Sequence, residues 1–513
     1  MNLEQLKNKK VAILGLGMEG VALANFLSNK VKNISLLDEK SRDELGDRVK
    51  EENDIKLENI LSNNNFEFML GKSYLNGLDK FDVIFRSPGI PYLLPEIQQA
   101  KKKGVEISSQ IKLFFDLCPC PIIGVTGTKG KGTTATLIFE MLKKPQTSNL
   151  KPQIYNLKTE ELENERTKKQ YNNLTIQQFN NIYLAGNIGE PAINLINKIS
   201  KDDLVILELS SFQLQDLEKS PHIAVVLNIL VDHLDYHKDE AEYKESKVSI
   251  VKYQNKNDFA VINQDYLISF EYASQTNAHV CYFSAKDSVD EGAYIKPSQN
   301  SKLKTQNYGK DLYEVVLRMN DKEEVICRSD EVKLIGKHNL ENIAAAAIAA
   351  KIAGADIESI KKAAIEFEGL PHRLEFTAEI NEVKYYNDSF ATSPGPTMAA
   401  IDSFKEPINL ILGGSSKGAD FSDLADFVKK SNVVNVNLIG AEAEKIGKAL
   451  QKSGYDGNIS TPVFDINQIV KEVMSEVKSG DVVLFSPACA SFDMFKNYKD
   501  RGEKFKKAVL KLK

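Results

Sequence analysis

The strongest chemical signal in the sequence is a glycine-rich loop between an apolar run and an amphipathic segment. Residues 124–134 read GVTGTKGKGTT, after the strand-like run 122–125 and before a predicted helix over 135–142. Glycines let the backbone approach phosphate oxygens, and a helix N-terminus adds positive potential there. Lys131 can then reach the outer phosphates. The loop predicts nucleoside triphosphate binding, with a plain glycine-rich turn as the alternative.

The loop departs from the strict phosphate-loop pattern G-x-x-x-x-G-K-[ST] at two positions. Val125 stands at the first glycine position, and Gly132 replaces the hydroxyl residue that would bind a metal. Thr133 or Thr134 can supply that hydroxyl instead. We therefore predict a variant loop whose metal-binding hydroxyl is shifted along the helix.

Acidic and histidine side chains follow two further strand-like runs. Glu208 lies at the end of the run 204–209, and the sequence D-H-L-D, with His233, follows the run 223–229. Ligands of α/β proteins bind at the carboxyl ends of parallel strands, and carboxylates beside phosphates commonly hold Mg²⁺. A magnesium site at this edge is predicted, with ordinary strand-end and loop hydrogen bonding as the alternative.

Two polar motifs lie on predicted helices further along. Lys247 follows Tyr243 by one helical turn, and an unmodified lysine is no metal ligand, so taken alone it is a solvated surface residue. Asn339 and Asn342 share one face of the first turn of an alanine-rich helix. Helix capping and hydrogen bonding to a base edge both fit these asparagines.

The N-terminal segment carries a second glycine pattern. Gly15, Gly17 and Gly20 follow the strand-like run 11–14, and Asp38 closes the next run. This spacing matches a dinucleotide-binding fingerprint with its acidic partner about 20 residues on. Taken alone, it predicts a nicotinamide-dependent dehydrogenase. A further glycine turn at 86–91 can contact the ribose or phosphates of a nucleotide.

The C-terminal part offers three polar segments after strand-like runs, at 387–392, 413–418 and 486–502. Hydroxyls, an amine and helix N-terminal amides at strand ends favour a ligand that carries a carboxylate. The alternative is that these are glycine-rich turns and helix caps.

The elements that position these residues alternate between strands and helices. Further strand-like runs are 34–37, 82–85, 408–412, 434–439 and 482–485, and a helix is expected over 20–27. Several runs are apolar at every position, which is typical of parallel strands covered on both faces, so an α/β fold is predicted. Two polar segments, 40–65 and 143–181, are too polar to form domains.

Length and composition limit the number of domains and the class of protein. At about 150 residues per domain, 513 residues suggest three domains, which we place at 1–110, 111–369 and 370–513. A hydrophobic fraction of 42% supports folded cores, and 66 basic against 71 acidic residues argue against a general nucleic-acid binder. Without a membrane-length apolar run, a signal peptide or a disulfide framework, a soluble cytoplasmic protein is expected.

Taken together and in order, the motifs resemble the Mur ligase family of peptidoglycan synthesis. The phosphate loop, Glu208, D-H-L-D, Y-x-x-x-K, G-x-H-N-x-x-N and L-P-H-R carry the resemblance. The G-L-G-x-x-G start and the S-P-A-C-A-S-F-D segment resemble the members that add D-glutamate to UDP-N-acetylmuramoyl-L-alanine. The match spans nearly the whole chain apart from the two polar segments.

The resemblance implies a Rossmann-like N-terminal domain for the UDP-substrate, a central P-loop-type ATPase domain with a mostly parallel sheet, and a Rossmann-like C-terminal domain for the amino acid. It implies an ATP-dependent ligase, acting through an acyl phosphate as a cytoplasmic monomer, without nucleic-acid or membrane partners. Mg²⁺ at two sites and CO₂, as a carbamate on Lys247, are the implied cofactors.

Site residues are carried over position by position. The resemblance implies catalytic roles for Lys131, Glu208, His233 and Lys247, the last three at the metal sites. ATP contacts are implied for Gly127, Thr128, Lys129, Gly130, Lys131, Gly132, Thr133, Asn339, Asn342, Arg373 and Asp388. UDP-substrate contacts are implied for Gly17, Met18, Glu19, Asp38, Gly89 and Asn187, and amino-acid contacts for Thr392, Lys417, Ser491 and Tyr498. Two positions depart from the family pattern. Gly132 stands where the family has Ser or Thr, and Phe390 stands where it often has Lys.

Three other interpretations stay open at this point. A nicotinamide oxidoreductase would explain the N-terminal fingerprint but not the loop at Lys131. A related glutamate-adding ligase, such as a folylpolyglutamate synthase, would leave the N-terminal fingerprint unexplained. A paralogue that binds nucleotide without turnover would fit the departures at Gly132 and Phe390.

Overall fold

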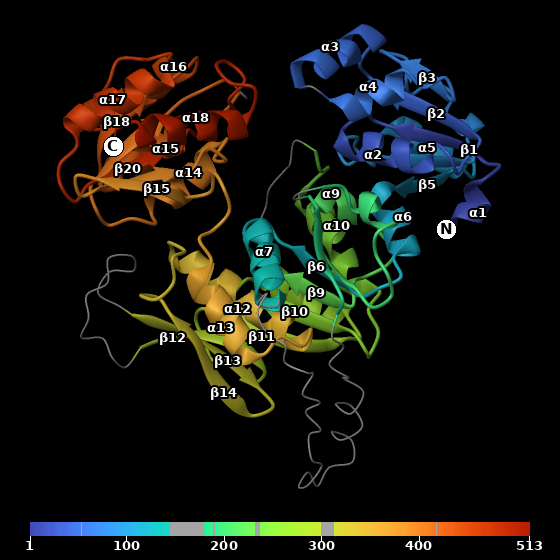
Figure 1. Cartoon of the computed structure of the whole chain (residues 1–513), viewed down its shortest axis with the longest axis horizontal. Coiled ribbons are helices and arrows are strands. Elements are labelled where there is room, and N and C mark those ends of the chain that lie inside the picture. Colours follow the sequence, from blue (N-terminus) through green and yellow to red (C-terminus); the bar gives the residue numbers. More distant parts are fainter. Residues whose placement is uncertain are drawn as a thin grey trace. The chain divides into compact units, whose positions relative to one another are not determined.

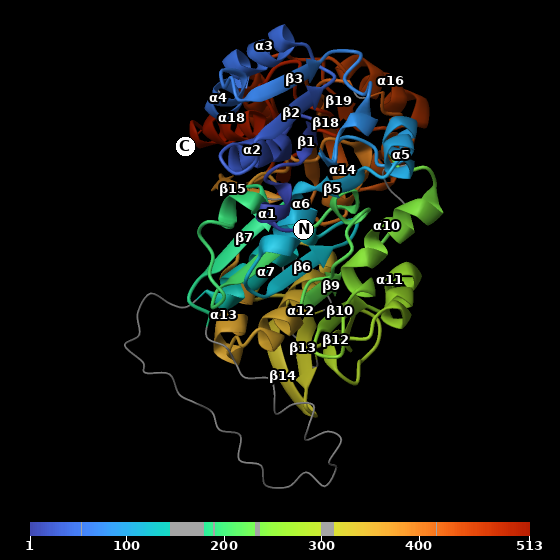
Figure 2. The same ribbon diagram turned by 90° about the vertical axis from the view of Figure 1, so that its right-hand side faces the viewer.

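The computed structural model describes residues 1–52, 54–143, 179–187, 190–230, 236–298, 312–416 and 418–512. This part of the chain forms three β-sheets flanked by helices (Figures 1 and 2). The chain folds into two compact units. The first unit holds the N-terminal sheet and nearly all of the middle sheet, and the second holds the C-terminal sheet.

The N-terminal sheet has five parallel strands in the order β3-β2-β1-β4-β5, which is a Rossmann-like arrangement. Alternate residues of β1 enter two different cores: Val11 and Ile13 pack on one face, and Ala12 and Leu14 on the other. The strands are β1 Lys10–Leu14, β2 Asn33–Asp38, β3 Phe66–Leu70, β4 Val83–Arg86 and β5 Glu106–Ser109. The helices are α1 Leu3–Leu6, α2 Met18–Leu27, α3 Arg42–Glu52, α4 Ile55–Leu61, η1 Leu78–Lys80, α5 Pro95–Lys102 and α6 Gln110–Leu117.

The polar segment 40–65 forms no domain of its own and contributes two helices to the N-terminal sheet. It forms α3 and α4, and Leu45, Leu57 and Ile60 from these helices are fully buried in the core beneath β1 and β2. Three well-spaced apolar side chains are enough to attach both helices to the sheet, although the segment as a whole is strongly polar. Most of the second polar segment, 144–178, lies outside the described residues.

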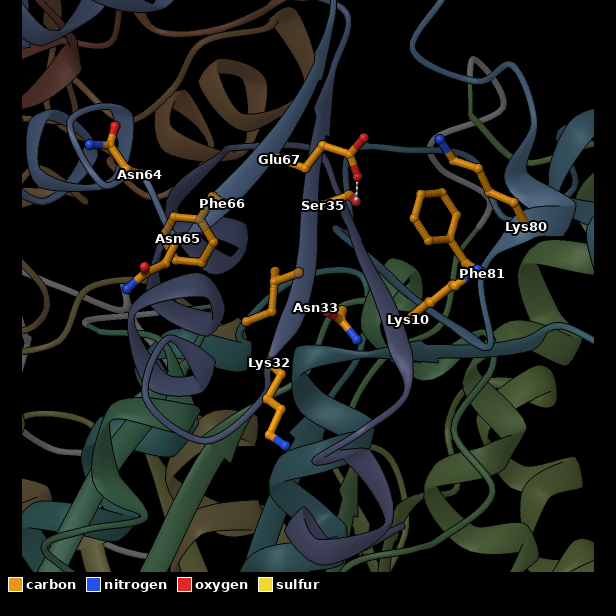
Figure 3. Close-up of a pocket in the computed structure, with 11 residues that line it drawn as sticks. Lys10, Lys32, Asn33, Ser35, Asn64, Asn65, Phe66, Glu67, Lys80 and Phe81 are labelled. Carbon is orange, nitrogen blue, oxygen red and sulfur yellow. Dashed lines mark hydrogen bonds between the residues drawn. The ribbon is translucent and has the colours of Figure 1, made fainter.

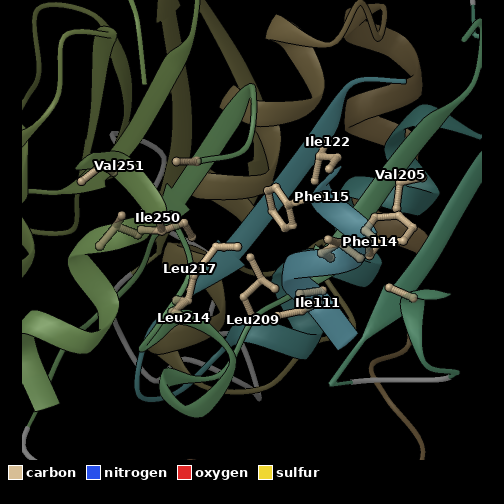
Figure 4. Packing of buried hydrophobic residues seen from close by; sticks show 14 of the residues in the cluster. Ile111, Phe114, Phe115, Ile122, Val205, Leu209, Leu214, Leu217, Ile250 and Val251 are labelled. Atoms are coloured by element: carbon tan, nitrogen blue, oxygen red, sulfur yellow. The ribbon is translucent and has the colours of Figure 1, made fainter. Parts of the chain in front are cut away.

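The middle sheet has nine strands in the order β14-β13-β12-β11-β10-β9-β6-β8-β7, with parallel pairing from β7 to β12. Its core cluster contains Ile111 and Phe114 of α6 together with Val205, Leu209 and Leu214 (Figure 4). The strands are β6 Ile122–Thr126, β7 Ile182–Gly186, β8 Leu204–Glu208, β9 Ile223–Val226, β10 Phe259–Asn263, β11 His279–Ser284, β12 Gly292–Pro297, β13 Tyr313–Met319 and β14 Lys322–Arg328. The helices are α7 Lys131–Leu142, η2 Ala192–Leu195, α9 Ser211–Leu214, α10 Glu240–Lys252, α11 Leu267–Glu271, η3 Tyr272–Gln275, α12 Lys337–Ile352 and α13 Ile357–Glu366.

The C-terminal sheet has the order β15-β16-β20-β17-β18-β19, in which only the β15–β16 pair is antiparallel. Its two faces are also covered: Leu410 and Leu484 enter one core, and Ile411 and Phe485 the other. The strands are β15 Glu375–Ile380, β16 Val383–Asn387, β17 Ile408–Leu412, β18 Val433–Leu438, β19 Asn458–Ile459 and β20 Val482–Phe485. The helices are α14 Pro394–Ile401, α15 Ser422–Lys430, α16 Ala443–Ser453, α17 Ile466–Glu476 and α18 Tyr498–Leu510.

The predicted α/β class and mostly parallel sheets are confirmed, as is the presence of three domains. Each strand-like run singled out in the sequence is a strand, although β9 ends at Val226, three residues before the run 223–229 does. The strands that were not predicted are β3, β5, β7, β10–β16 and β19. The domain limits at 110 and 369 stay predictions.

Candidate active site

The phosphate loop joins β6 to α7, and two of its glycines are required by its geometry. Gly130 caps α7 with a left-handed φ of +86°, and a Cβ built there would lie 2.3 Å from Oδ1 of Asn342. Gly127 has φ +154° and lies against Leu227. Only glycine adopts such backbone without strain and allows this close packing. The loop therefore presents backbone rather than side chains at the helix N-terminus.

Neighbouring elements hold the loop from two sides. Thr128 N donates to the carbonyl of Asn228 at 2.6 Å, and Lys129 N donates to the Asn228 side chain at 3.0 Å. The Thr128 hydroxyl lies 3.0 Å from the hydroxyl of Tyr243 on α10. No role of their own was predicted for Tyr243 and Asn228, because their partners are distant in sequence.

Two ammonium groups meet at one carbonyl oxygen of the loop. Nζ of Lys131 donates to the Gly127 carbonyl at 3.0 Å, and Nζ of the buried Lys247 donates to the same oxygen at 3.4 Å. Lys247 is therefore not the solvated surface lysine suggested by its local sequence. Two like charges at one acceptor repel each other in a site of low dielectric, so this edge attracts negative charge.

Glu208 lies beside the loop, as predicted, at the carboxyl end of β8. The strand is in register with β6, with Glu208 opposite Val125, and the side chain is buried. Oε1 of Glu208 accepts from Nδ2 of Asn187 at 3.0 Å. The structure thus brings together Glu208, Asn187 and the two lysines at one edge of the middle sheet.

The two threonines that could replace the missing hydroxyl at Gly132 differ in their surroundings. Thr134 is buried and its hydroxyl donates to Oδ1 of Asn342 at 3.2 Å. Thr133 is partly exposed on the first turn of α7. Of the two, Thr133 is the better candidate for metal ligation, because Asn342 already uses the Thr134 hydroxyl.

His233 and Lys417 lie outside the described residues, as does the rest of the D-H-L-D motif. The described chain resumes at Tyr236, and the next residue, His237, is a buried link. Its Nδ1 lies 2.7 Å from Glu242 on α10, and its Nε2 lies 3.0 Å from the Ser211 hydroxyl. His237 therefore joins the segment that follows Glu208 to the helix that carries Lys247.

The N-terminal fingerprint forms the predicted turn between β1 and α2. Gly20 must be glycine, because a Cβ there would lie 1.9 Å from the Gly15 carbonyl oxygen. Asp38 holds the turn: its two oxygens accept from Leu16 N at 2.6 Å and from Lys40 N at 2.9 Å. Gly17, Met18 and Gly89 are exposed at the carboxyl ends of the strands. Their contacts with a ligand stay predictions.

Glu19, on the first turn of α2, is an incompletely hydrogen-bonded carboxylate at the carboxyl edge of this sheet. Its Oε1 accepts from Nε2 of Gln213 at 2.6 Å, whereas Oε2 is buried without a hydrogen-bond partner among the described residues. Burial raises the pKa of Glu19 to about 7, against the lowering effects of the Gln213 bond and the nearby Arg86.

A pocket of about 530 Å³ lies elsewhere in this sheet, at the amino ends of its strands (Figure 3). Its lining includes Lys10, Ser35, Glu67 and Phe81, and Ser35 donates to Glu67 at 2.7 Å. No residue of the predicted site lines it. Because ligands of open α/β sheets bind at the carboxyl ends of strands, this pocket is not the active site.

In the second unit, the predicted nucleotide residues Arg373 and Asp388 lie close together. Asp388 is buried and accepts from Ser486 Oγ at 2.7 Å and from Leu374 N at 3.2 Å. Burial raises the pKa of Asp388 to about 7. The Arg373 guanidinium lies 3.9 Å from the centre of the Phe390 ring, so Phe390 stacks with a cation instead of supplying one.

Asn339 lies within the first turn of α12, which begins at Lys337, and so it is not a helix cap. Its Nδ2 donates to the Ile335 carbonyl at 2.7 Å. Asn342 follows on the same helix and contacts the phosphate loop through Thr134. The capping alternative for this pair is therefore wrong, and their nucleotide contacts stay predictions.

The three C-terminal segments converge at one edge of their sheet. The buried Arg501 on α18 donates to the Ser389 hydroxyl and carbonyl, and to the Cys489 and Ala490 carbonyls, at 2.8–3.0 Å. Ser415 pairs with Ala490 in an isolated bridge. Thr392, Ser491 and Tyr498 all belong to these loops or to the start of α18. No role was predicted for Arg501, which fixes two of the three loops.

Family models match the three parts of the chain in order. They are the Mur ligase MurD-like N-terminal domain at 9–109, the Mur ligase middle domain at 125–350 and the Mur ligase glutamate ligase domain at 372–489. A UDP-N-acetylmuramoylalanine–D-glutamate ligase of Clostridium tetani is 38% identical over 98% of this chain and 97% of its own. The enzyme of that name from Acetivibrio thermocellus is 37% identical over 99% and 97%.

Solved structures agree on the fold at lower identity. The UDP-N-acetylmuramate-alanine ligase of Thermotoga maritima superposes with a TM-score of 0.54 at 15% identity, covering 98% of this chain and 100% of that one. The MurF ligase of Thermotoga maritima, solved in complex with ADP, gives 0.54 at 16% identity over 100% and 97%. The order of the motifs, the three sheets and full-length relatives agree: this chain belongs to the Mur ligase family.

Proposed function

We propose that this protein is an ATP-dependent ligase that adds D-glutamate to UDP-N-acetylmuramoyl-L-alanine in peptidoglycan precursor synthesis. The observation that carries the proposal is the cluster of Lys131, Lys247, Glu208 and Asn187 around a loop suited to phosphates. Relatives that bear this activity in their names align over 97–98% of their length. A nicotinamide oxidoreductase would use the N-terminal fingerprint but would leave Lys131, Lys247 and Glu208 without a role.

The reaction divides into two steps. The carboxylate of the UDP-substrate attacks the γ-phosphorus of ATP, and ADP leaves as the acyl phosphate forms. The amine of D-glutamate then attacks the acyl carbon, passes through a tetrahedral intermediate and releases phosphate. Lys131 offsets charge on the transferring group, where positioning and electrostatics supply most of the catalysis. His233 is proposed to align the acyl phosphate.

The residues at this edge fit Mg²⁺. Glu208 supplies a buried carboxylate beside the loop, and Thr133 supplies a hydroxyl on the first turn of α7. Oxygen donors of this kind are those that Mg²⁺ prefers. When bound, Mg²⁺ would offset negative charge on the phosphates. Glu208, His233 and a modified Lys247 are the proposed ligands at two sites.

A carbamate on Lys247 is supported by the charges around it. The Nζ atoms of Lys247 and Lys131 both lie within hydrogen-bond distance of the Gly127 carbonyl. Loss of one proton from the Lys247 ammonium gives the amine, and addition of CO₂ to that amine, with loss of a second proton, would create a carboxylate. That change turns a repulsion with Lys131 into an attraction and supplies a metal ligand in place of a cation.

The C-terminal edge is proposed to receive D-glutamate, through Thr392, Lys417, Ser491 and Tyr498. ATP is proposed to contact residues 127–133, Asn339, Asn342, Arg373 and Asp388, and the UDP-substrate to contact Gly17, Met18, Glu19, Asp38, Gly89 and Asn187. Among the described residues, no helix has the length and apolar character to cross a membrane. We propose a cytoplasmic monomer with domains at 1–110, 111–369 and 370–513.

The test is phosphate release from ATP by the purified protein with UDP-N-acetylmuramoyl-L-alanine, Mg²⁺ and a panel of amino acids. D-glutamate should give the fastest release, and Lys131→Ala should lower kcat by about 100-fold or more. Lys143→Ala, at the exposed end of the same helix, is the matched control and should retain activity. Release no faster than that of Lys131→Ala with every amino acid would refute the proposal.

The carbamate has its own test. Lys247→Ala should lose activity and regain part of it when a short carboxylic acid is added, because the acid can occupy the position of the carbamate. Lys252→Ala, an exposed lysine at the end of the same helix, is the control. Full activity of Lys247→Ala, or a loss that no carboxylic acid restores, would contradict the proposed modification.

A further inference from the structure

Strands β11 and β12 place three potential metal ligands side by side. His279 and Cys281 are two residues apart on β11, so their side chains leave the same face of the sheet. The register pairs Tyr282 with Gly292, which puts Glu291 beside Cys281. One imidazole nitrogen, the thiol sulfur and one carboxylate oxygen all lie within 4.8 Å of one another. His279 Nε2 and Glu291 Oε2 are 3.0 Å apart.

This cluster is separate from the nucleotide edge of the same sheet. His279 is level with Phe259, which is level with Ile223, and Ile223 is level with Ile123 near the start of β6. The phosphate loop follows the other end of β6. Because all these strands are parallel, the cluster lies at the amino edge of the sheet and the proposed reaction makes no use of it.

We propose that His279, Cys281 and Glu291 form a binding site for a divalent transition metal of the zinc class. A thiolate, an imidazole and a carboxylate are the three donor types that Zn²⁺ uses, and three protein ligands leave a fourth tetrahedral position for water. The thiolate disfavours Mg²⁺ and Ca²⁺, which bind oxygen ligands. A metal here would tie β11 to β12.

The surroundings of the three residues suit a bound cation. Cys281 is fully buried at the base of the cluster, whereas the side chains of His279 and Glu291 are 25% and 26% exposed. An ion can therefore reach the site from solvent and meet the thiol beneath.

The test is titration of the full-length protein with Co²⁺, a spectroscopic substitute for Zn²⁺, in excess Mg²⁺ to occupy oxygen-ligand sites. We expect a near-ultraviolet thiolate-to-cobalt charge-transfer band and the intense visible bands of a tetrahedral ion, both abolished by Zn²⁺. Cys281→Ala should remove the charge-transfer band. Glu291→Gln, which leaves the core intact, should weaken Co²⁺ binding by about tenfold or more.

The double variant Cys118→Ser/Cys120→Ser is the control, since the thiols of Cys118 and Cys120 lie only 3.6 Å apart and could themselves bind a soft metal. The charge-transfer band should persist in this variant. Circular dichroism and thermal melting without metal establish that each variant is folded. The proposal is overturned if the wild-type protein shows no thiolate band at saturating Co²⁺, if the band persists in Cys281→Ala, or if Glu291→Gln binds as tightly as wild type.

Discussion

The raised pKa of Glu19 predicts that replacing this acid by glutamine stabilises the protein in a pH-dependent way. The folded state holds a proton on Glu19 up to a pH of about 7, whereas the unfolded chain releases it near 4.5. The folded state therefore binds more protons across this window, and its stability falls as the pH rises through it. Above pH 7 the loss is complete.

The magnitude follows from the two pKa values. A pKa moved from 4.5 to about 7 corresponds to about 3 kcal/mol, at about 1.4 kcal/mol for each tenfold change. This is an upper value, because part of Glu19 remains exposed and water can reach the carboxylate. Glu19→Gln keeps an oxygen to accept the 2.6 Å bond from Gln213 but carries no charge to desolvate. We expect a gain over wild type that grows from near zero at pH 4.5 to about 1–3 kcal/mol at pH 8.

The assay is urea unfolding of ligand-free protein, followed by circular dichroism at pH 5 and pH 8. The control is Glu96→Gln, an exposed acid on the first turn of α5 in the same domain. Its effect on stability should be small at both pH values. Equal stability of Glu19→Gln and wild type at pH 8, or a difference between them that does not change with pH, would refute the reasoning.

Three further changes test the packing around the phosphate loop. Gly130→Ala should destabilise the protein by about 1–2 kcal/mol in thermal melting because of its left-handed φ and the contact with Asn342, whereas Gly46→Ala in the open interior of α3 should be neutral or stabilising. Tyr243→Phe should weaken ATP binding about fivefold in calorimetric titration, since one hydrogen bond to the loop is worth about 1 kcal/mol. His237→Ala should lower the melting temperature and kcat together, because it removes the link to Glu242 and leaves the buried Ser211 hydroxyl without this partner, at about 1–3 kcal/mol. Unchanged kcat would contradict this.

The phosphate loop and the strand that ends at Glu208 could be predicted from the sequence, because short-range requirements of the backbone determine them. Gly127 and Gly130 must be glycines for the loop to form, and Glu208 ends an apolar run. The position of each residue in the fold could therefore be predicted from its neighbours in the sequence alone. The strands β13 and β14 gave no such signal. They join through Asn320 and Asp321, both with left-handed φ, and β14 keeps its first four residues exposed, so its pattern is neither apolar nor cleanly alternating.

Interactions between distant residues account for what local sequence could not show. The partner of Glu19, Gln213, is 194 residues away, and Lys247 meets the phosphate loop across 120 residues. Local spacing made Lys247 a surface residue because its own helix is polar around it. Glu19 and Lys247 are surrounded by other residues only once the sheet edges have assembled. Before that, only the resemblance to a family indicated a role for Lys247.

Arg86 shows how such long-range contacts serve the chemistry. At the end of β4 its guanidinium donates to the Ile90 carbonyl at 2.7 Å, to the Tyr236 hydroxyl at 2.9 Å and to the Phe212 carbonyl at 2.9 Å, and it lies 3.4 Å from Asp216. Both terminal nitrogens of this buried guanidinium have acceptors, whereas its Nε is buried without a partner among the described residues. Removing an acceptor from a buried charge is costly, so these partners are held in one arrangement. Phe212 and Tyr236 flank the segments after Glu208 and after the D-H-L-D motif. Phosphoryl transfer to a carboxylate requires reacting atoms about 3–3.5 Å apart, and a rigid link between the N-terminal turn and the edge that carries Glu208 is the kind of device that can hold such a distance.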